Sequence, residues 1–358
     1  MPSSTSSSEP QTPRGPWGRT WLLAGLLTAG LLGGWELYWR TQGFFPTRVS
    51  DEPLWLLARE KLTAAERPIA LIGASRSQVG IDLDVFAART GVRPVQLGIC
   101  YSSPTPVLRE LAEDATFAGL VICDVTPLLF FQSGGPVVER SNRYLARAHT
   151  YVSPADRLEW QLQLALETML VTRLDRLAPE HFAECWAKGT WPEPGLGSLR
   201  ADRMITAYYP PGFAAGRPTT VGPFKRNPYL ADAARRDALL DQVAQDVERI
   251  RGRGGEVVFV VLPFTDDYRQ KERALAPRAE YWDRLLARTG APGIHFEDFP
   301  SLSGFDCPDG CHLDSRDAPR FTRALLDALQ PALAGTAWEL EPGAPLRTVM
   351  RPSTGSDR

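Results

Sequence analysis

Short, almost wholly apolar runs that recur between helical segments are the feature that most constrains the fold of this chain. A run of four to eight such residues bounded by Gly or Pro is typical of a strand that is buried on both faces. Strands of this kind occur in parallel sheets whose two faces are covered by helices. The sequence therefore predicts an α/β fold with a three-layer parallel sheet. The runs are residues 69–73, 95–98, 119–125, 256–263 and 294–299.

Helical patterns fill the stretches between these runs. They cover residues 82–90, 103–118, 239–251, 278–289 and 317–329. Gly91 and Gly252 directly follow two of them, as glycine commonly does at helix ends. In open parallel sheets, ligands bind beyond the carboxyl ends of the strands. Residues that follow the apolar runs are therefore the first candidates for function.

An uninterrupted apolar or small run extends from residue 20 to residue 35. Arg14 and Arg19 precede it, which indicates that the N-terminus stays in the cytoplasm and the body lies outside. We expect a transmembrane anchor over residues 20–39. A cleaved signal peptide is the alternative, because the run is short for a span of about 17–25 residues. Aromatic residues bracket the run, as they do at membrane interfaces: Trp17, Trp21, Trp35, Tyr38 and Trp39.

Composition divides the rest of the chain. Residues 1–19, rich in Ser and Pro, are expected to form a disordered tail, and residues 40–66 a connecting segment. The α/β domain is expected over residues 67–334, with a mostly helical insertion at about 130–235, where the alternation of strands and helices is lost. We expect this insertion to cap the carboxyl edge of the sheet. Residues 335–358 are expected to be poorly ordered.

Charge and cysteine content exclude two classes of protein. The 358 residues carry a formal net charge of −2, with basic and acidic residues interspersed. Nucleic-acid binding needs a basic surface, so no such partner is expected. The five cysteines are too few for a disulfide scaffold in a chain of this length. In an oxidising compartment, a possible disulfide between Cys307 and Cys311 would clamp the loop that carries Asp309 and His312.

Two motifs together suggest a serine nucleophile. Gly73-Ala74-Ser75 follows the first apolar run, and Asp309-Gly310-Cys311-His312 lies between the fifth run and the last helix. An Asp three residues before a His, on a turn, projects both side chains the same way, so the carboxylate orients the ring. A His held like this takes the proton of a serine hydroxyl, which is otherwise too weak a nucleophile. Both motifs fall at the same edge of the predicted sheet.

Several of these residues also have a purely structural interpretation. Ser75 is of a type that commonly caps the N-terminus of a helix. Gly98, after the second run, would then only serve a tight turn. Arg76 either binds an anionic substrate group or forms a salt bridge at the sheet edge. The histidines that lack an Asp at the same spacing, and that we interpret as surface or core residues, are His149, His181 and His295.

The motifs resemble those of the SGNH, or GDSL-type, hydrolase superfamily, particularly its membrane-anchored members linked to acyl transfer onto cell-envelope polymers. The resemblance covers roughly residues 65–130 and 236–330 and implies a flavodoxin-like sheet. It implies that Ser75 is the nucleophile, His312 the general base and Asp309 the residue that orients this base. Ala74 stands where the family usually has Asp.

The resemblance also implies an oxyanion hole. In the family, its donors are the N–H of the nucleophile, a Gly N–H after the second strand and an Asn side chain after the third. Ser75 and Gly98 match the first two. The third has no match, and an ionised Asp124 would repel the oxyanion. Losing one donor lowers the rate by about 100- to 1,000-fold, so either Thr126 or another donor such as Asn142 substitutes, or the enzyme is slow.

The function implied by the resemblance is that of a serine esterase or O-acyltransferase in a bacterial inner or cytoplasmic membrane. Its catalytic domain would lie in the periplasm and act on acylated envelope polysaccharide through an acyl-serine intermediate. A multispanning membrane acyltransferase is the implied partner, and neither a cofactor nor a metal is expected. The alternative is a non-catalytic module that binds polysaccharide or a membrane partner and carries a vestigial triad.

Two further interpretations concern the segment from Cys307 to His312. It is one residue longer than the Cys-x-x-Cys-His pattern of haem attachment, and a haem would not need the α/β body. A zinc site of Cys307, Cys311 and His312 would lack a second ligand pair. We regard both as weaker than the serine interpretation.

Overall fold

The computed structural model describes residues 17–150, 152–213 and 228–339. The chain divides into two compact units, one of residues 1–47 and 165–194 and the other of residues 48–164 and 195–358. The tails expected to be disordered fall mostly at residues 1–16 and 340–358, which lie outside the described residues.

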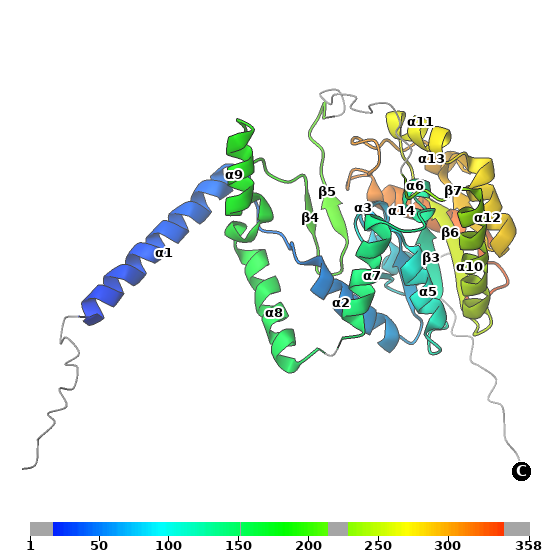
Figure 1. Cartoon of the computed structure of the whole chain (residues 1–358), viewed down its shortest axis with the longest axis horizontal. Coiled ribbons are helices and arrows are strands. Elements are labelled where there is room, and N and C mark those ends of the chain that lie inside the picture. The colour runs from blue at the N-terminus through cyan, green and yellow to red at the C-terminus, as the bar shows by residue number, and fades with distance from the viewer. Residues whose placement is uncertain (1–16, 151, 214–227, 340–358) are drawn as a thin grey trace, which may run out of the picture. The chain divides into compact units, whose positions relative to one another are not determined.

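A five-stranded parallel sheet forms the centre of the second unit (Figure 1). The strands lie in the order β2-β1-β3-β6-β7, which is the order 2-1-3-4-5 of flavodoxin-like sheets when they are counted along the chain. The prediction of an α/β fold with a parallel sheet is confirmed. The strands are β1 (Ile69–Ile72), β2 (Val95–Gln96), β3 (Leu120–Asp124), β6 (Glu256–Val261) and β7 (Gly293–His295).

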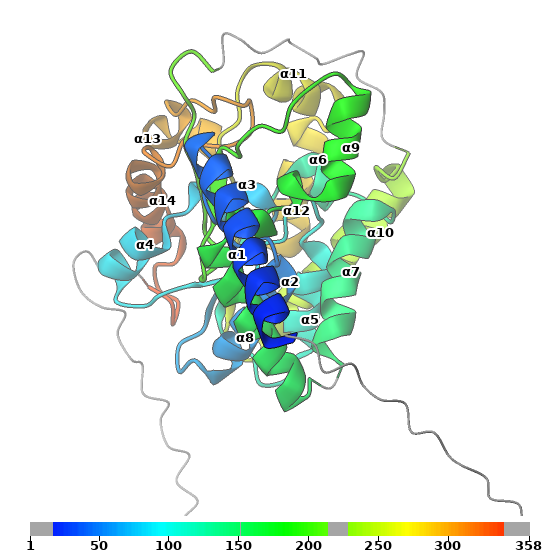
Figure 2. The same ribbon diagram turned by 90° about the vertical axis from the view of Figure 1, so that its left-hand side faces the viewer.

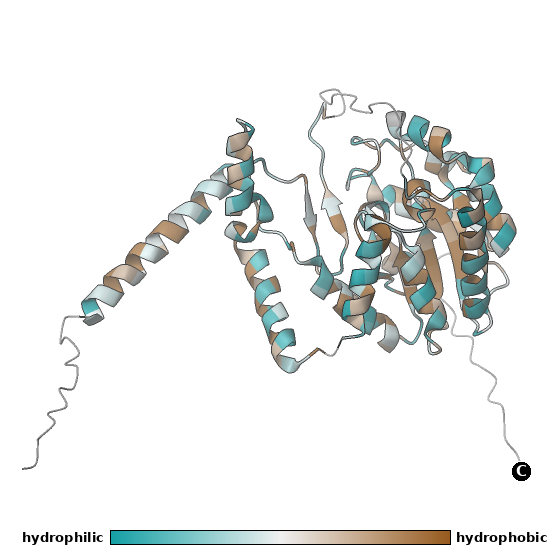
Figure 3. Ribbon diagram, viewed as in Figure 1, coloured by the Kyte–Doolittle hydropathy of each residue, from teal (hydrophilic) through white to brown (hydrophobic). Residues whose placement is uncertain are grey.

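Burial explains why these strands have such apolar sequences. Every residue of β1, β3 and β6 is buried, and Figure 3 shows the strands as hydrophobic ribbons behind amphipathic helices. In parallel sheets both faces are covered, so the usual alternation of polar and apolar residues disappears. The register that pairs Ile72 of β1 with Cys123 of β3 brings the ends of these two strands together.

Helices cover both faces of the sheet (Figure 2). On one face α10 packs against both α5 and α12, and on the other face α4 packs against α14. The helices of the α/β body are α2 (Asp51–Ala64), α3 (Ser75–Gly80), α4 (Leu83–Thr90), α5 (Thr105–Glu113), α10 (Ala233–Arg251), α11 (Asp266–Leu275), η4 (Arg278–Glu280), α12 (Trp282–Thr289), α13 (Pro300–Ser303) and α14 (Ala318–Ala332).

The fifth apolar run forms a shorter strand than its sequence predicts. β7 ends at His295, and the chain turns into η5 (Phe296–Asp298). The Glu297 N–H donates to His295 Nδ1 at 3.3 Å, which caps this turn. Phe296 is fully buried although it lies outside the strand. Its apolar character therefore reflects core packing and not continued strand pairing.

The region between β3 and α10 combines helices with a small antiparallel hairpin. Its helices are α6 (Pro127–Phe130), α7 (Pro136–Ala148), α8 (Pro154–Met169), η1 (Val171–Arg173), η2 (Asp175–Leu177) and α9 (Pro179–Ala187). Strands β4 (Gly197–Leu199) and β5 (Ile205–Ala207) form the hairpin. The sequence suggests one insertion here, but residues 165–194 belong to the first unit while the hairpin belongs to the second.

In the first unit, α1 (Trp17–Thr41) is the one helix among the described residues that is long and apolar enough to cross a membrane. Its 25 residues span about 37 Å, more than the roughly 30 Å of a bilayer core. The large apolar side chains of α1 from Trp21 to Leu32 are exposed, as expected of a helix that needs an apolar surrounding. An anchor and a signal sequence share these properties.

Candidate active site

The turn that carries Ser75 is shaped by a close approach of two strands. β1 ends at Ile72, and Gly73 follows with a φ of +156°. A Cβ atom at Gly73 would lie 2.6 Å from Asp124 Cβ and 2.9 Å from Ser77 Oγ. Only glycine fits this position without displacing β3, and the chain passes directly from it into α3.

Ser75 is the first residue of α3, and its side chain does not cap this helix. The N-cap residue is Ala74, which has no side-chain capping bond. The capping interpretation of Ser75 is therefore wrong. Instead, Ser75 Oγ lies 2.7 Å from His312 Nε2, across 237 residues of sequence. The structure thus brings the two predicted motifs together.

The turn that carries His312 is organised by one carboxylate. Asp309 Oδ1 accepts the backbone N–H groups of Cys311 and His312 at 2.9 and 2.6 Å. This arrangement is the Asx turn that Asp favours. It leaves Oδ2 facing the ring, 2.6 Å from His312 Nδ1. The side chains of Asp309 and His312 remain 13% and 21% exposed, so solvent reaches the pair.

The predicted disulfide between Cys307 and Cys311 is not formed. Both are free thiols. Cys307 is buried, and its Sγ donates to the carbonyl oxygen of Pro263 at 3.3 Å, which ties the loop to the segment after β6. Cys311 Sγ instead lies 3.2 Å from His312 Nδ1. The two sulfur atoms have different partners, and the hydrogen bonds of Asp309 perform the clamping expected of the disulfide.

The electrostatics of the pair favour a charged imidazole. Burial opposes the charge on His312, but the hydrogen bond that its Nδ1–H donates to Asp309 and the neighbouring Cys311 outweigh it and raise the pKa of His312 to about 9. The hydrogen bond with His312 and its charge, together with the two backbone N–H groups, outweigh the effect of burial on Asp309 and lower the pKa of its carboxyl. Asp309 is therefore an ionised partner that stabilises a protonated His312.

A buried charged cluster adjoins the Ser75 turn. Arg76 Nη2 donates to Glu272 Oε1 of α11 at 3.0 Å, with only 4% and 3% of the two side chains exposed. This confirms the salt bridge as the structural interpretation of Arg76. Arg76 also stacks over the ring of Phe264. Burial raises the pKa of Asp124 to about 7, although Arg76 opposes the shift. Near neutral pH, a substantial share of Asp124 is therefore uncharged.

The predicted oxyanion donors differ in their surroundings. The Gly98 N–H donates to Gln96 Oε1 at 2.8 Å, so it already has an acceptor. Thr126 follows β3, and its hydroxyl is buried without a partner in the part of the chain that the structure describes. Asn142 is exposed on α7 and lines a groove with residues of α5 and α10. The structure does not bring Asn142 to the site.

Two side chains that the sequence analysis does not select support the loop after β2. Gln96 bridges Gly98 and the carbonyl oxygen of Ser77, to which it donates at 3.0 Å. Arg203 is fully buried with a φ of +67° and donates to the carbonyl oxygens of Gln96 and Gly98, both at 2.7 Å. Asp51 accepts two further bonds from the Arg203 guanidinium. A positive φ at a buried arginine is unusual and typical of a functional constraint.

A cavity of about 570 Å³ adjoins α3. Gln78, one helical turn after Ser75, lines it together with Cys100 from the loop after β2. Asp51 and Arg140 give it a polar wall. The cavity therefore extends from α3, the helix that begins with Ser75, to residues 49–53, which precede β1.

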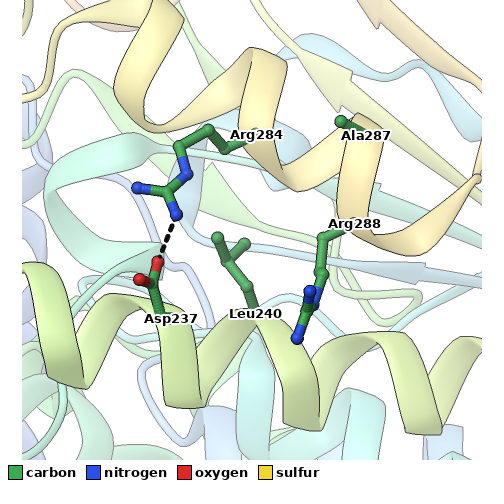
Figure 4. Close-up of a pocket in the computed structure, with 5 residues that line it drawn as sticks. All are labelled: Asp237, Leu240, Arg284, Ala287 and Arg288. Atoms are coloured by element: carbon green, nitrogen blue, oxygen red, sulfur yellow. Dashed lines mark hydrogen bonds and ion pairs between the residues drawn. The ribbon is translucent and has the colours of Figure 1, made fainter.

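A second pocket, of about 300 Å³, lies between α10 and α12 (Figure 4). Its walls are formed by a surface ion pair, in which Arg284 donates to Asp237 at 2.6 Å, and by the apolar side chain of Leu240. None of the predicted site residues lines this pocket, so we do not regard it as the active site.

Comparisons with known proteins add little to this geometry. No family model matches the chain, and no curated protein matches it. Among the solved structures, the crystal structure of TesA is similar with a TM-score of 0.35 and 12% sequence identity, covering 75% of this chain and 100% of that chain. Similarity at this level carries no inference about activity. The functional conclusion rests on the residues around Ser75.

Proposed function

We propose that this protein is a serine esterase or O-acyltransferase of the SGNH type, with Ser75 as nucleophile. The observation that carries the proposal is the continuous hydrogen-bonded chain from Ser75 Oγ through His312 to Asp309, with distances of 2.7 and 2.6 Å. A base within hydrogen-bonding reach of the hydroxyl and a carboxylate that orients this base are what an activated serine requires.

The reaction follows from these contacts. His312 Nε2 takes the proton of Ser75 Oγ as the oxygen attacks the ester carbonyl, and Asp309 stabilises the imidazolium that forms. The imidazolium then gives its proton to the departing alcohol, which leaves an acyl group on Ser75. In the second half, water or another hydroxyl gives its proton to His312 and attacks the acyl-serine, and His312 returns this proton to Ser75 Oγ as the bond between Oγ and the acyl group breaks. An acceptor other than water makes the same chemistry a transfer.

The proposed oxyanion hole combines a backbone and a side-chain donor. The N–H of Ser75 lies at the first position of α3, where no intrahelical acceptor exists. The buried Thr126 hydroxyl, at the end of the neighbouring β3, is available as a second donor. Gly98 is left out because its N–H is bonded to Gln96. Asp124 in its uncharged form would not repel the oxyanion.

We further propose that α1 anchors the protein in a bacterial inner or cytoplasmic membrane, with the serine site in the periplasm. The length and apolar surface of α1 support the anchor, and Arg14 and Arg19 support the orientation. Acylated envelope polysaccharide as substrate and a multispanning membrane acyltransferase as partner belong to the same proposal.

Hydrolysis of an aryl acetate by the full-length protein in detergent tests the activity. We expect Ser75→Ala to lower the rate by about 1,000-fold or more, and Ser301→Ala, which removes an exposed hydroxyl on α13, to leave it unchanged. Melting temperatures establish that each variant is folded. Equal rates for wild type and Ser75→Ala would refute the proposal.

A non-catalytic binding module is the second candidate. The observation in its favour is the engaged N–H of Gly98, which deprives the site of one family donor. Glycan binding that persists in Ser75→Ala, combined with absent hydrolysis in the wild type, would favour this module over the enzyme.

A further inference from the structure

Three side chains with metal-binding atoms meet on the His312 turn. Asp309 Oδ2 and Cys311 Sγ lie 2.6 and 3.2 Å from the same atom, His312 Nδ1. The ligand atoms of these residues all lie within 4.8 Å of one another, and each side chain is only partly buried. A thiol, an imidazole and a carboxylate are the three ligand types that Zn²⁺ binds in proteins.

We propose that Asp309, Cys311 and His312 bind a zinc ion, and that this ion switches off the serine chemistry at Ser75. The second half of the inference rests on the proposed function, whereas the binding of zinc does not. The set differs from the one that the sequence suggests, because Cys307 is committed to Pro263 and Asp309 takes its place.

The existing distances are close to those that zinc needs. Ligand bonds of about 2.0–2.1 Å to nitrogen and oxygen and about 2.3 Å to sulfur place the ligand atoms of a tetrahedron roughly 3.3–3.6 Å apart. The sulfur, at 3.2 Å from Nδ1, is nearly at that spacing. The carboxylate oxygen must move outward by about 0.7 Å from its 2.6 Å position. A water molecule would complete the tetrahedron.

Charge and protons balance at this site. The thiol of Cys311 releases its proton to solvent and becomes a thiolate, as zinc ligation requires. The thiolate and the Asp309 carboxylate cancel the two positive charges of the ion. His312 becomes neutral: zinc replaces the proton on Nδ1, which is released to solvent, and Nε2 keeps its proton. The centre is therefore uncharged, which suits a partly buried turn.

Inhibition follows from the position of that proton. In the zinc-free pair, once the imidazolium has lost a proton, Asp309 holds the remaining proton on Nδ1, and Nε2 is free to accept the Ser75 hydroxyl. With zinc on Nδ1, Nε2 carries the proton and donates to Ser75 Oγ instead. His312 then has no free electron pair with which to accept the serine proton, and Asp309 no longer stabilises an imidazolium.

The test uses the full-length protein in detergent with Co²⁺ as a spectroscopic substitute for zinc. A cobalt–thiolate bond gives a charge-transfer absorption, which a site without sulfur lacks. We expect this band in the wild type, at one ion per chain, and its loss on adding Zn²⁺. Cys311→Ser should lose the band. Cys185→Ser, which changes a buried thiol of α9 in the other unit, should keep it.

Zinc affinity and hydrolysis provide the second readout. Losing an outer partner of a metal site already weakens binding by about 10- to 100-fold, so removing the thiolate ligand should weaken zinc binding by about 100-fold or more. Zinc should inhibit aryl acetate hydrolysis by wild type and Cys185→Ser, while the rate of Cys311→Ser should be the same with and without zinc.

The outcomes separate the two proposals. An unchanged cobalt band in Cys311→Ser, or no band in the wild type, would overturn the metal site. A normal band without inhibition would overturn the switch. If the wild type binds cobalt through Cys311 but hydrolyses no ester at any zinc concentration, the metal site stands, and the proposed enzymatic function fails together with the switch.

Discussion

The two turns that meet at Ser75 and His312 are held in place by different forces. The Ser75 turn is fixed by packing: Gly73 lies against Asp124, and the neighbouring Arg76 is buried in an ion pair with Glu272. The His312 turn is partly exposed and is fixed by the hydrogen bonds of one carboxylate, Asp309. Changes of volume should therefore damage the first turn, and changes of charge should damage the second.

This contrast separates stability from chemistry. A perturbation of the packed turn acts on the core of the sheet and should lower the free energy of unfolding. A perturbation of the hydrogen-bonded turn, near the surface, should leave the fold intact and change only the orientation and charge of His312. The following experiments, from the largest expected effect to the smallest, test whether the two turns differ in this way.

Replacing Asp309 by Asn should abolish most activity without unfolding the protein. The amide cannot stabilise a protonated His312 and favours the wrong tautomer, which lowers turnover by about 10,000-fold in a comparable triad. The melting temperature should change little. Asp306→Asn, at an exposed position of the same loop, serves as the control. A large drop in melting temperature for Asp309→Asn would contradict the assignment of this turn to chemistry.

Replacing Glu272 by Ala should destabilise the packed turn. It leaves the guanidinium of Arg76 buried without its 3.0 Å partner, and breaking a buried pair in this way lowers the free energy of unfolding by about 3–5 kcal/mol. Chemical denaturation measures the loss. Glu60→Ala, which breaks the exposed pair with Arg157, should have no measurable effect. Equal stabilities of both variants would show that the buried pair is not what holds the turn.

Two glycine variants compare the turns directly. Gly73→Ala places a Cβ atom 2.6 Å from Asp124 Cβ, and such overpacking lowers the free energy of unfolding by about 1–3 kcal/mol. Gly310→Ala meets no atom closer than 3.6 Å and is disfavoured only by its φ of +86°, at about 1–2 kcal/mol. Chemical denaturation of both variants under the same conditions shows which one loses more free energy of unfolding, and we expect the larger loss for Gly73→Ala. The reverse order would remove the distinction between a packed and a hydrogen-bonded turn.

Hydrolysis should depend on pH through His312. Because its folded pKa is raised to about 9 from an ordinary value of 6.5, the base is mostly protonated below pH 9, and kcat/KM should fall about tenfold per pH unit there. The free energy of unfolding should change in the opposite direction. The stabilisation by the pair of protonated His312 and Asp309 is fully present below pH 6.5 and is lost as the pH rises through about 9. Rates of hydrolysis and melting temperatures, measured across this pH range with a chelator present to remove metal ions, check the two predictions. A rate independent of pH between 6 and 9 would exclude His312 as the base.

Much of the fold follows from the sequence because the apolar runs record burial on both faces of the sheet. The ends of elements are less predictable. The run at residues 294–299 stays apolar after β7 has ended, since Phe296 packs in the core from a turn. Nor does the sequence reveal that residues 165–194 group with the N-terminal helix. Such groupings depend on contacts between distant segments that have no periodic pattern.

The candidate site is predictable where its geometry is local. Asp309 and His312 share one turn, so their spacing determines their contact. Ser75 joins them because both motifs follow strands of one parallel sheet. The contact of Gln96 with Gly98 gives no signal in a strand of two residues, and the clamp by Arg203 spans more than a hundred positions. The sequence suggests a disulfide between Cys311 and Cys307 because spacing alone does not show which way a side chain points.

The most direct test of the central claim is covalent labelling of the full-length protein by a fluorophosphonate, followed by mass spectrometry of its peptides. Such a probe reacts with a serine only where a neighbouring base activates the hydroxyl. We predict a single adduct on Ser75 in the wild type and in Ser301→Ala, and its loss in His312→Ala with the fold retained. An unlabelled Ser75 in the folded wild type, or labelling that persists in folded His312→Ala, would contradict the account.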